Sequence, residues 1–423
     1  MPTRRAGSEN TCIINPEGHY YSMYGIFSYD IVSPRVGWKF NRDSILDLEI
    51  VGLSGYFDDL NIDVSVFAQS VLNDFIALGK SAHQAVWQRI NDLLADNAKG
   101  LDTVHDQVFI HQSRAKMHLP IRIGDYTDFY AGIHHAENVG RMFRPDSDPL
   151  LPNYKHIPVA YHGRSSSIVV SGTPIHRPSG QFLGPDKQPV FGPSQALDFE
   201  LELGLIIGKS NPPGEPVPID KAEEYIFGVT LFNDWSARDI QRWEYQPLGP
   251  FLGKNFASSL SAWVLPFDEL EPFRIAGSQQ QPTPLPYLKT SEPGHFTLDL
   301  EVWLQPTAGE AVCICHTNAR NLYWTFAQMI AHHTVGGCNL TIGDVLATGT
   351  ISGTEPGSYG SLLELSWNGE RPLHLSRTET RTFLADGDTV TLRGWGFQNG
   401  TRVDLGEVTG TIIGNRNFKS GIE

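Results

Sequence analysis

The spacing of apolar residues changes along this 423-residue chain, and the change limits the folds that it can adopt. From Tyr24 to about Leu53, short alternations of apolar and polar residues between turn residues predict a few small strands. Between Val66 and Asp96, apolar residues recur at helical spacing instead. Beyond Met117 strands dominate, so a strand-then-helix unit precedes a longer, mainly β part.

The longer part has the pattern of a long-looped, mostly antiparallel β structure. Five of its stretches alternate as strands do: Ser167–Val170, Phe199–Ile207, Phe296–Leu304, Cys313–His316 and Thr389–Trp395. Two stretches have helical spacing: Ala237–Trp243 and Leu322–Thr334. The 41 Gly and 28 Pro residues, about a sixth of the chain, suit many turns. No GxGxxG or P-loop motif is present, so a doubly wound nucleotide-binding sheet is not expected.

The charge of the chain excludes several partners. Asp and Glu number 47 against 32 Lys and Arg, which gives a net charge of −15. Nucleic acids and anionic membranes are therefore not expected partners, because both attract an excess of positive charge. No apolar stretch reaches the roughly 18 residues of a membrane-spanning helix. The polar first residues and the absence of zinc-type or CxxC cysteine spacing favour a cytoplasmic location.

Three acidic residues alternate along one predicted strand. In Leu197–Leu203 the apolar side chains share one face, and Asp198, Glu200 and Glu202 share the other. The simplest interpretation of this strand alone is a solvent-exposed acidic face. However, three like charges repel, and the following apolar run Leu205–Ile207 indicates a buried setting. A divalent cation would relieve the repulsion, and oxygen ligands suit calcium or magnesium.

Two other segments contain the further acids that such a shell needs. Gly124–Tyr130 contains two aspartates and is followed by His134 and His135, and Phe232–Tyr245 contains Asp234 at the end of a strand. Taken singly, these acids are ordinary turn or helix-capping residues, and the imidazoles are ordinary surface or core groups. Together, their density in loop-like segments predicts a functional site, since loops on a rigid scaffold often hold catalytic groups.

These segments resemble, in order, the fumarylacetoacetate hydrolase family. The likeness runs from about Met117 to about Thr389, with shorter strings before it. It is carried by Gly124–Tyr130, His135–Gly140, Tyr161–Ser165, Asn233–Gln241, Pro247–Lys254 and Gly349–Gly353, and more weakly by Tyr24–Ser28, Ile45–Leu48 and Leu72–Phe75. The resemblance implies a mainly β fold with some α: a small N-terminal β-barrel-like domain with a helical segment at residues 1–118, then a larger mixed β-roll catalytic domain at residues 119–423 that pairs as a homodimer.

The resemblance also implies an activity, the metal-dependent hydrolysis of the carbon–carbon bond of 4-fumarylacetoacetate to fumarate and acetoacetate. Two alternatives stay open. One is a hydrolase or decarboxylase of the same fold that acts on another β-diketone, an acylpyruvate or oxaloacetate. The other is a catalytically inactive scaffold, which would have no chemical need of the acids, His135 and Lys254 together.

The family's metal ligands match Asp128, Glu200, Glu202 and Asp234 of this chain. They would bind a calcium or magnesium ion. A second cation, magnesium, would lie near Asp234, Lys254 and Ser258. The Lys254 ammonium cannot itself ligate a metal, so this residue would offer its backbone oxygen or lie alongside.

The family's catalytic groups match residues from several segments. His135 matches the general base, and Glu364, which the pattern of Leu362–Leu365 places on an apolar strand, matches the acid that orients it. Arg238, Gln241 and Lys254 match the groups that stabilise the developing enolate charge. The substrate-binding positions are Tyr130, Arg144, Gln241, Tyr245 and Thr350. The alternative for Arg238 is a helix-surface ion pair with a neighbouring acid, Asp239 or Glu244.

Overall fold

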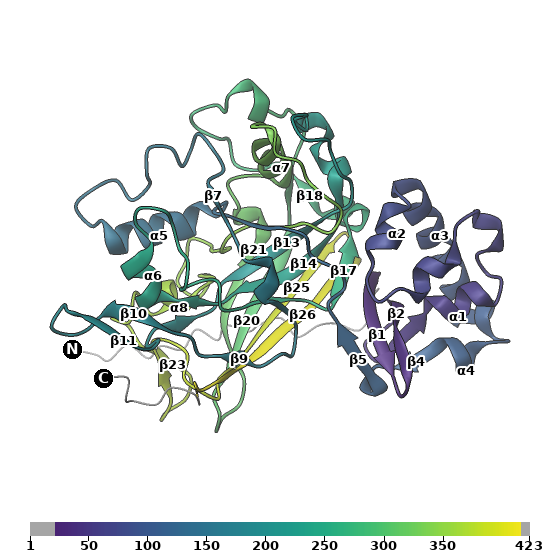
Figure 1. The fold of residues 1–423 in the computed structure, drawn as a ribbon, viewed down its shortest axis with the longest axis horizontal. Helices are drawn as coiled ribbons and strands as arrows, with labels where there is room; N and C mark the ends of the chain where they lie inside the picture. The colour runs from purple at the N-terminus through teal and green to yellow at the C-terminus, as the bar shows by residue number, and fades with distance from the viewer. Residues whose placement is uncertain (1–21, 416–423) are drawn as a thin grey trace.

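The computed structural model describes residues 22–415, and one large sheet runs through both parts of the chain (Figure 1). Thirteen strands form it. Ten follow the order β4-β3-β2-β1-β17-β14-β13-β22-β6-β7, and β5, β8 and β16 pair beside this path. The first 21 residues, which the sequence analysis assigns to the N-terminal domain, and residues 416–423 lie outside the described range.

The N-terminal part combines strands and helices. Its strands are β1 (Met23–Tyr29), β2 (Val32–Lys39), β3 (Ser44–Asp47), β4 (Phe109–His111) and β5 (Ala115–His118). Its α-helices are α1 (Leu48–Leu53), α2 (Asn73–Ala77), α3 (Lys80–Ala98) and α4 (His105–Val108). The helical prediction for residues 66–96 is confirmed by α2 and α3. Strand was wrongly predicted up to Leu53: the Asp47 side chain accepts hydrogen bonds from the backbone N–H groups of Glu49 (3.1 Å) and Ile50 (3.2 Å), which caps helix α1.

Strand β1 joins the two parts of the molecule. It pairs with β2 on one side, and on the other side with β5 and with β17 (Trp263–Pro266) of the longer part. Among the strands of residues 22–415, the pairing order does not close on itself. The two-part, mainly β fold is therefore confirmed, but the N-terminal strands form an open sheet and no closed barrel.

The centre of the longer part is the remainder of this sheet. Its strands are β6 (Tyr126–Phe129), β7 (Ala160–His162), β8 (Ile168–Val170), β13 (Leu201–Ile207), β14 (Ile226–Asp234), β16 (Ser258–Leu260) and β22 (Val345–Ala347). Every residue of β13 and β14 is buried. Side chains of β13 alternate between two cores: Leu203 and Leu205 enter the larger one, whereas Ile206 packs with the N-terminal helices. Burial on both faces explains the near-continuous apolar runs of these strands.

The longer part also contains a second sheet of five strands, in the order β21-β20-β25-β26-β9. Its strands are β9 (Ile175–His176), β20 (Leu298–Gln305), β21 (Val312–Asn318), β25 (Thr389–Gln398) and β26 (Thr401–Ile413). The α-helices of this part are α5 (Ile133–Phe143), α6 (Arg238–Glu244), α7 (Phe326–Thr334) and α8 (Leu362–Leu365). Together with β8 and β13, these elements confirm the five predicted strands and both predicted helices within a few residues at their ends.

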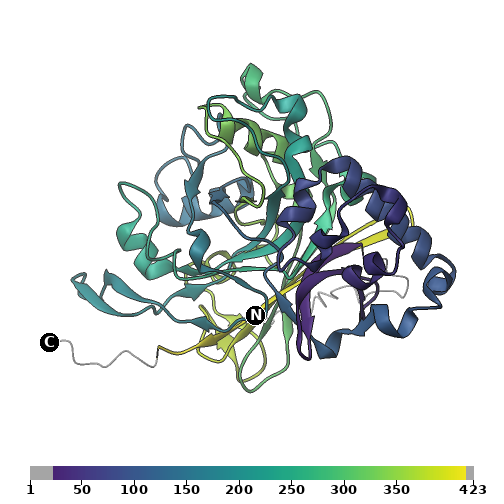
Figure 2. The same cartoon turned by 45° about the vertical axis from the view of Figure 1, so that its right-hand side comes forward.

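The two views place the N-terminal helices, in purple, at one end of the molecule, and helices α5 and α6 near the other (Figures 1 and 2). The N-terminal part docks through a shared apolar core. Tyr24 of β1, Phe75 of α2 and Phe227 of β14 form ring contacts with centroids 5.0 to 6.2 Å apart. Within residues 22–415, no helix combines the length and the apolar character that crossing a bilayer requires.

Candidate active site

Four carboxylates converge where adjacent strands of the large sheet meet. Asp234 ends β14, Glu202 lies in β13, Asp128 lies in β6, and Glu200 immediately precedes β13. The strand order β14-β13-β22-β6 brings these residues together, and one oxygen of each lies within 4.8 Å of the others. All four side chains are buried. The interpretation of a solvent-exposed acidic face is therefore wrong, because all three acids of that face, Asp198, Glu200 and Glu202, are buried.

The electrostatics of the cluster fit a divalent cation. Burial and the charges of neighbouring acids raise the pKa of Asp128 and that of Glu202 well above the usual range of a carboxyl group. Burial also raises the pKa of Glu200, but the cations Lys254 and Arg238 outweigh it and hold that pKa below its usual range. Asp128 Oδ1 and Glu202 Oε1 are buried without a hydrogen-bond partner. Crowded carboxylates with free oxygens are the ligands that calcium and magnesium prefer.

Lys254 lies beside the acid cluster. Its ammonium donates to Glu200 Oε2 (2.5 Å) and to Asp234 Oδ2 (2.7 Å). Asp234 also accepts a hydrogen bond from the hydroxyl of Tyr161 (2.8 Å) and one from that of Ser258 (2.8 Å). Lys254 and Ser258 thus contact Asp234 as hydrogen-bond donors, and a second cation near these three residues stays a prediction.

A buried histidine–glutamate pair lies close to the acids. His135 Nδ1 is 2.6 Å from Glu364 Oε2. The same carboxylate accepts hydrogen bonds from Asn138 (2.9 Å), Ser352 (2.8 Å) and Ser361 (2.9 Å). Burial raises the pKa of Glu364, but His135 and these donors outweigh it and lower that pKa. Because a carboxylate only accepts, the proton of a neutral His135 resides on Nδ1, and Nε2 is left to take up a proton.

Local sequence explains how this pair is built. In helix α5, His135 and Asn138 are three residues apart and share one face, so both reach Glu364. Glu364 lies on helix α8 and not on the predicted strand. Ser361 caps α8, since its side chain accepts a hydrogen bond from the backbone N–H of Glu364.

Helix α6 supplies the cationic side chain Arg238. Its Nε donates to Asp198 Oδ2 (2.8 Å), and its Nη1 lies 2.7 Å from Glu200 Oε1. Its Nη2 is buried without a hydrogen-bond partner. The alternative of a helix-surface ion pair is wrong, because Asp239 instead accepts hydrogen bonds from Ser194 and from the backbone of Gln195, and Glu244 accepts from the backbone of the following loop.

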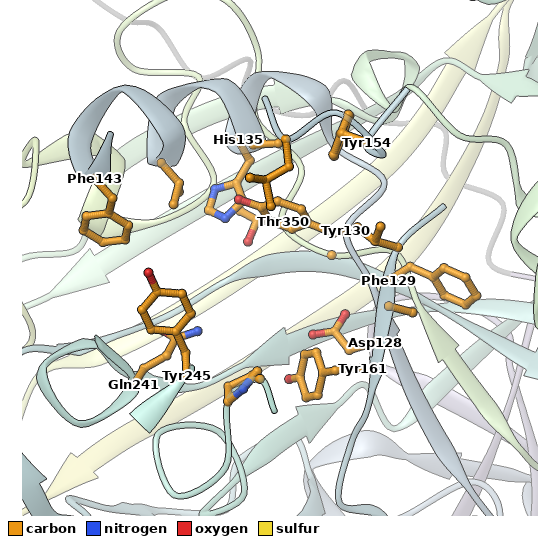
Figure 3. Close-up of a pocket in the computed structure, with 18 of the residues that line it drawn as sticks. Asp128, Phe129, Tyr130, His135, Phe143, Tyr154, Tyr161, Gln241, Tyr245 and Thr350 are labelled. Carbon is orange, nitrogen blue, oxygen red and sulfur yellow. The ribbon is translucent and has the colours of Figure 1, made fainter. Parts of the chain in front are cut away.

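A cavity of about 490 Å³ opens over these groups (Figure 3). Ten of the residues predicted from the sequence line it: Asp128, Tyr130, His135, Arg144, Glu200, Arg238, Gln241, Tyr245, Lys254 and Thr350. The remaining four, Glu202, Asp234, Ser258 and Glu364, do not line the cavity, and each contacts a group of the site or belongs to the acid cluster. His134, unlike His135, is not among the lining residues.

Two polar atoms of cavity-lining residues have no hydrogen-bond partner. Arg144 Nε and Thr350 Oγ1 are buried without hydrogen-bond partners, and the Tyr130 ring stands edge-on to His135 with centroids 5.3 Å apart. Figure 3 shows Tyr245 and Gln241 across the cavity from His135. Tyr245 is 41% exposed, which places it at the mouth. A cavity with polar groups at fixed positions suits a small organic acid.

Gly349 allows the backbone segment that carries Thr350 to lie close to the backbone of Phe129 in strand β6. Its φ of +75° is in the left-handed region, and a Cβ there would lie 2.1 Å from the carbonyl oxygen of Phe129. Its backbone N–H donates to Glu202 Oε2 (3.1 Å). The residue therefore ties an acid of the cluster to the segment that carries Thr350.

Sequence reasoning assigned no role to three polar residues of the site: Asn138, Tyr161 and Asp198. The spacing of three residues between His135 and Asn138 in a helix is a signal that could have identified the first. Asp198 shares the alternation of Glu200 and Glu202. Tyr161 has no comparable local signal, because it reaches Asp234 only through the pairing of β6 with β7.

The buried acids can hold a metal ion and the His135–Glu364 pair can take up a proton, a combination that fits the active site of an enzyme. The profile of the fumarylacetoacetate (FAA) hydrolase C-terminal domain matches residues 126–413, and that of the fumarylacetoacetase N-terminal domain matches residues 24–120. The chain belongs to the fumarylacetoacetate hydrolase family.

Curated relatives cover nearly the whole chain. The chain is 47% identical over 397 residues to the fumarylacetoacetase of Rattus norvegicus, which covers 92% of this chain and 94% of the rat protein. It is also 47% identical over 397 residues to the fumarylacetoacetase of Arabidopsis thaliana, with the same coverage. Among solved structures, a fumarylacetoacetate hydrolase from Exiguobacterium antarcticum shares the fold, with a TM-score of 0.55, 17% identity, and coverage of 93% of this chain and 100% of that chain.

Proposed function

We propose that this chain hydrolyses the carbon–carbon bond of 4-fumarylacetoacetate and releases fumarate and acetoacetate. The observation that carries the proposal is the identity of 47% to curated fumarylacetoacetases over 92% of the chain. The cavity supports it as well, because a base, unpaired donors and metal-type ligands surround one space. The alternatives of another diketo acid or an inactive scaffold have no observation that favours them.

Asp128, Glu200, Glu202 and Asp234 are the proposed metal ligands. A calcium or magnesium ion held there would polarise the diketone oxygens of the substrate. The proposal of a second site, for magnesium, beside Asp234, Lys254 and Ser258 rests on the family resemblance. Lys254 and Ser258 would then act mainly by holding Asp234 in place, as their hydrogen bonds indicate.

His135 is the proposed general base. Its Nε2 takes a proton from water while the water oxygen attacks the carbonyl carbon, and Glu364 at Nδ1 stabilises the imidazolium that forms. The carbon–carbon bond then breaks, and its electron pair stays on the acetoacetate fragment as an enolate. This enolate takes up the proton that left the water, which gives acetoacetate and returns His135 to its neutral form. The free Nη2 of Arg238, with Lys254 and Gln241, is suited to stabilise this negative charge.

The substrate's carboxylate and diketo groups would bind to Tyr130, Arg144, Gln241, Tyr245 and Thr350. The unpaired Arg144 Nε and Thr350 Oγ1 support this assignment, because buried donors need an acceptor. The guanidinium of Arg144 is well shaped for a carboxylate.

Three further proposals concern the whole molecule. A homodimer is supported by exposed apolar side chains near the cavity mouth, such as Leu248 and Phe251. A division into domains between residues 118 and 119 is supported by the end of β5 at His118 and the start of β6 at Tyr126. The proposal of a cytoplasmic location rests only on sequence patterns.

One assay tests the proposed function. Purified protein supplied with calcium or magnesium should bleach the diketone absorbance of fumarylacetoacetate, with fumarate and acetoacetate formed in equal amounts. Acylpyruvate and oxaloacetate are offered in parallel. Turnover of only these two would overturn the substrate, and no turnover of any of them would favour an inactive scaffold.

A further inference from the structure

We infer that Asp198 is a positioning residue that holds Arg238 and the His135–Glu364 pair in one arrangement. The inference rests on the proposed function, because it concerns groups that the proposed reaction uses. Asp198 itself does not line the cavity. It is one of the three alternating acids of Leu197–Leu203, and it ends a short strand, β12 (Leu197–Asp198), that precedes β13. It is not among the four acids that could hold a metal ion.

The Asp198 carboxylate is completely buried and accepts four hydrogen bonds. Oδ2 accepts from Arg238 Nε (2.8 Å) and from the backbone N–H of Leu363 (2.9 Å). Oδ1 accepts from the backbone N–H groups of Leu362 (2.7 Å) and Phe199 (2.8 Å). One side chain therefore binds helix α6, helix α8 and the backbone of the next residue, Phe199, at the same time.

On helix α8, these contacts determine the place of Glu364. Leu362 and Leu363 are the two residues immediately before Glu364 in a helix of only four residues. A displacement of their N–H groups would therefore move Glu364, and with it the hydrogen bond to His135 Nδ1. The neighbouring bridge between Glu200 and Ser361, the cap of α8, ties the segment that follows Asp198 to the same helix.

On helix α6, Asp198 determines which nitrogen of Arg238 is free. Asp198 engages Nε and Glu200 engages Nη1, so Nη2 is the nitrogen left without a partner in a guanidinium that lines the cavity. Without the carboxylate at Nε, the guanidinium would lose one of the two acids that fix its plane. Arg238 and Glu364 would then lose their mutual orientation together.

A carboxylate is the chemical group that this position requires. The four donors around Asp198 are all N–H groups, and a carboxylate offers only acceptors. Asparagine has nearly the same shape, but its NH2 group would face at least one of these N–H donors. Asp198→Asn is therefore a mild change in volume that removes the proposed function of the side chain.

The matched control is Asp388→Asn. Asp388 is also completely buried, and it accepts from Arg381 Nε (2.8 Å) and Nη2 (2.9 Å) and from the backbone N–H of Ala385 (2.8 Å). It does not line the cavity. Both variants should lower Tm, but only Asp198→Asn should lower kcat, by about 100-fold, when assayed well below the Tm of each. A kcat for Asp198→Asn within threefold of the wild type would overturn the inference.

Two more readouts separate positioning from a merely structural role. In a double-mutant cycle, the losses in kcat from Asp198→Asn and Glu364→Gln should be less than additive, because Asp198 acts in part by holding the Glu364 that orients His135. Additive losses would contradict the inference. In protein isotope-labelled at histidine, the His135 Nδ1–H resonance should shift or broaden in Asp198→Asn and stay unchanged in Asp388→Asn.

The resonance also distinguishes the two proposals. If the wild-type protein does not turn over fumarylacetoacetate, the proposed function fails, while the Nδ1–H signal still reports whether Asp198 holds the pair. If the wild type is active and Asp198→Asn leaves both kcat and the resonance unchanged, only the positioning inference fails.

Discussion

His135 Nδ1 lies 2.6 Å from Glu364 Oε2, although the two residues are 229 positions apart in the sequence. Three more donors, from Asn138, Ser352 and Ser361, fix the same carboxylate. The imidazole therefore has one orientation and one tautomer before any substrate arrives. Its reactive nitrogen faces the cavity, and its charge, once formed, is already compensated.

Replacing Glu364 by glutamine should lower kcat by about 10²–10⁴-fold, because a neutral amide cannot stabilise the imidazolium formed when His135 takes up a proton. The initial rate of loss of diketone absorbance measures the effect. The control is Glu137→Gln on helix α5, the helix that carries His135; the Glu137 side chain contacts Arg141 (3.2 Å). Glu137→Gln should keep wild-type activity, and full activity of Glu364→Gln would refute the assigned role of the acid.

Exhaustive chelation should abolish turnover, and calcium or magnesium should restore it. Asp128→Asn should weaken binding of the restoring ion by at least about tenfold, since it removes one charged ligand of four. Calorimetric titration of the chelated protein with each cation measures this directly. Asp125→Asn, at an exposed residue three positions earlier, is the control. Activity that survives complete metal removal would contradict the ligand set.

Gly349→Ala should destabilise the protein by more than about 3 kcal/mol, since it adds steric overlap with the Phe129 carbonyl to left-handed backbone strain. The matched control is Gly400→Ala. Gly400 has a similar φ, +81°, but a Cβ there would have no atom within 4 Å. Strain alone should cost about 1–2 kcal/mol in the control. Denaturant unfolding measures both, and equal losses would mean that the close approach at Gly349 is unimportant.

Stability should depend on pH through Glu269. Burial raises the pKa of this carboxyl to about 7, so its neutral form is favoured in the folded state. Its stabilising contribution is complete below its unfolded pKa, near 4.5, and is lost as pH rises to about 7. The change in the free energy of unfolding caused by Glu269→Gln should therefore be more stabilising at pH 8 than at pH 5, by about 1–3 kcal/mol.

Thermal unfolding at the two pH values checks this prediction. Glu271→Gln, at a side chain that is 65% exposed and two residues further along, is the control and should change Tm equally at both. A pH-independent effect of Glu269→Gln would show that its carboxyl is already ionised in the folded protein.

Local periodicity predicted most of the fold, because apolar spacing is a property of neighbouring residues. It was wrong where a single cap decides the outcome: Asp47 starts helix α1, and Ser361 starts helix α8, in segments for which strands were predicted. The closed barrel was also not found. Whether β1 pairs onward with β17 is decided by residues more than 200 positions away, which no local pattern includes.

The candidate site, too, was predicted only in part from the sequence. Alternation identified Glu200 and Glu202, and the family resemblance supplied their partners. The burial of these acids depends on strands that pair from distant parts of the chain, such as β14 and β22, so the strand alone favoured an exposed face. The hydrogen bonds of Asp198 with Arg238 and of Tyr161 with Asp234 are tertiary contacts, and only the folded structure reveals them.

The shared sheet has a consequence for any shortened form of the chain. β1 covers the edge of β17, and the N-terminal helices cover Phe227 and Ile206. A protein that began after residue 118 would present an unpaired strand edge beside a bare apolar surface, the combination that promotes aggregation. The N-terminal part therefore protects the solubility of the catalytic part, whatever else it does.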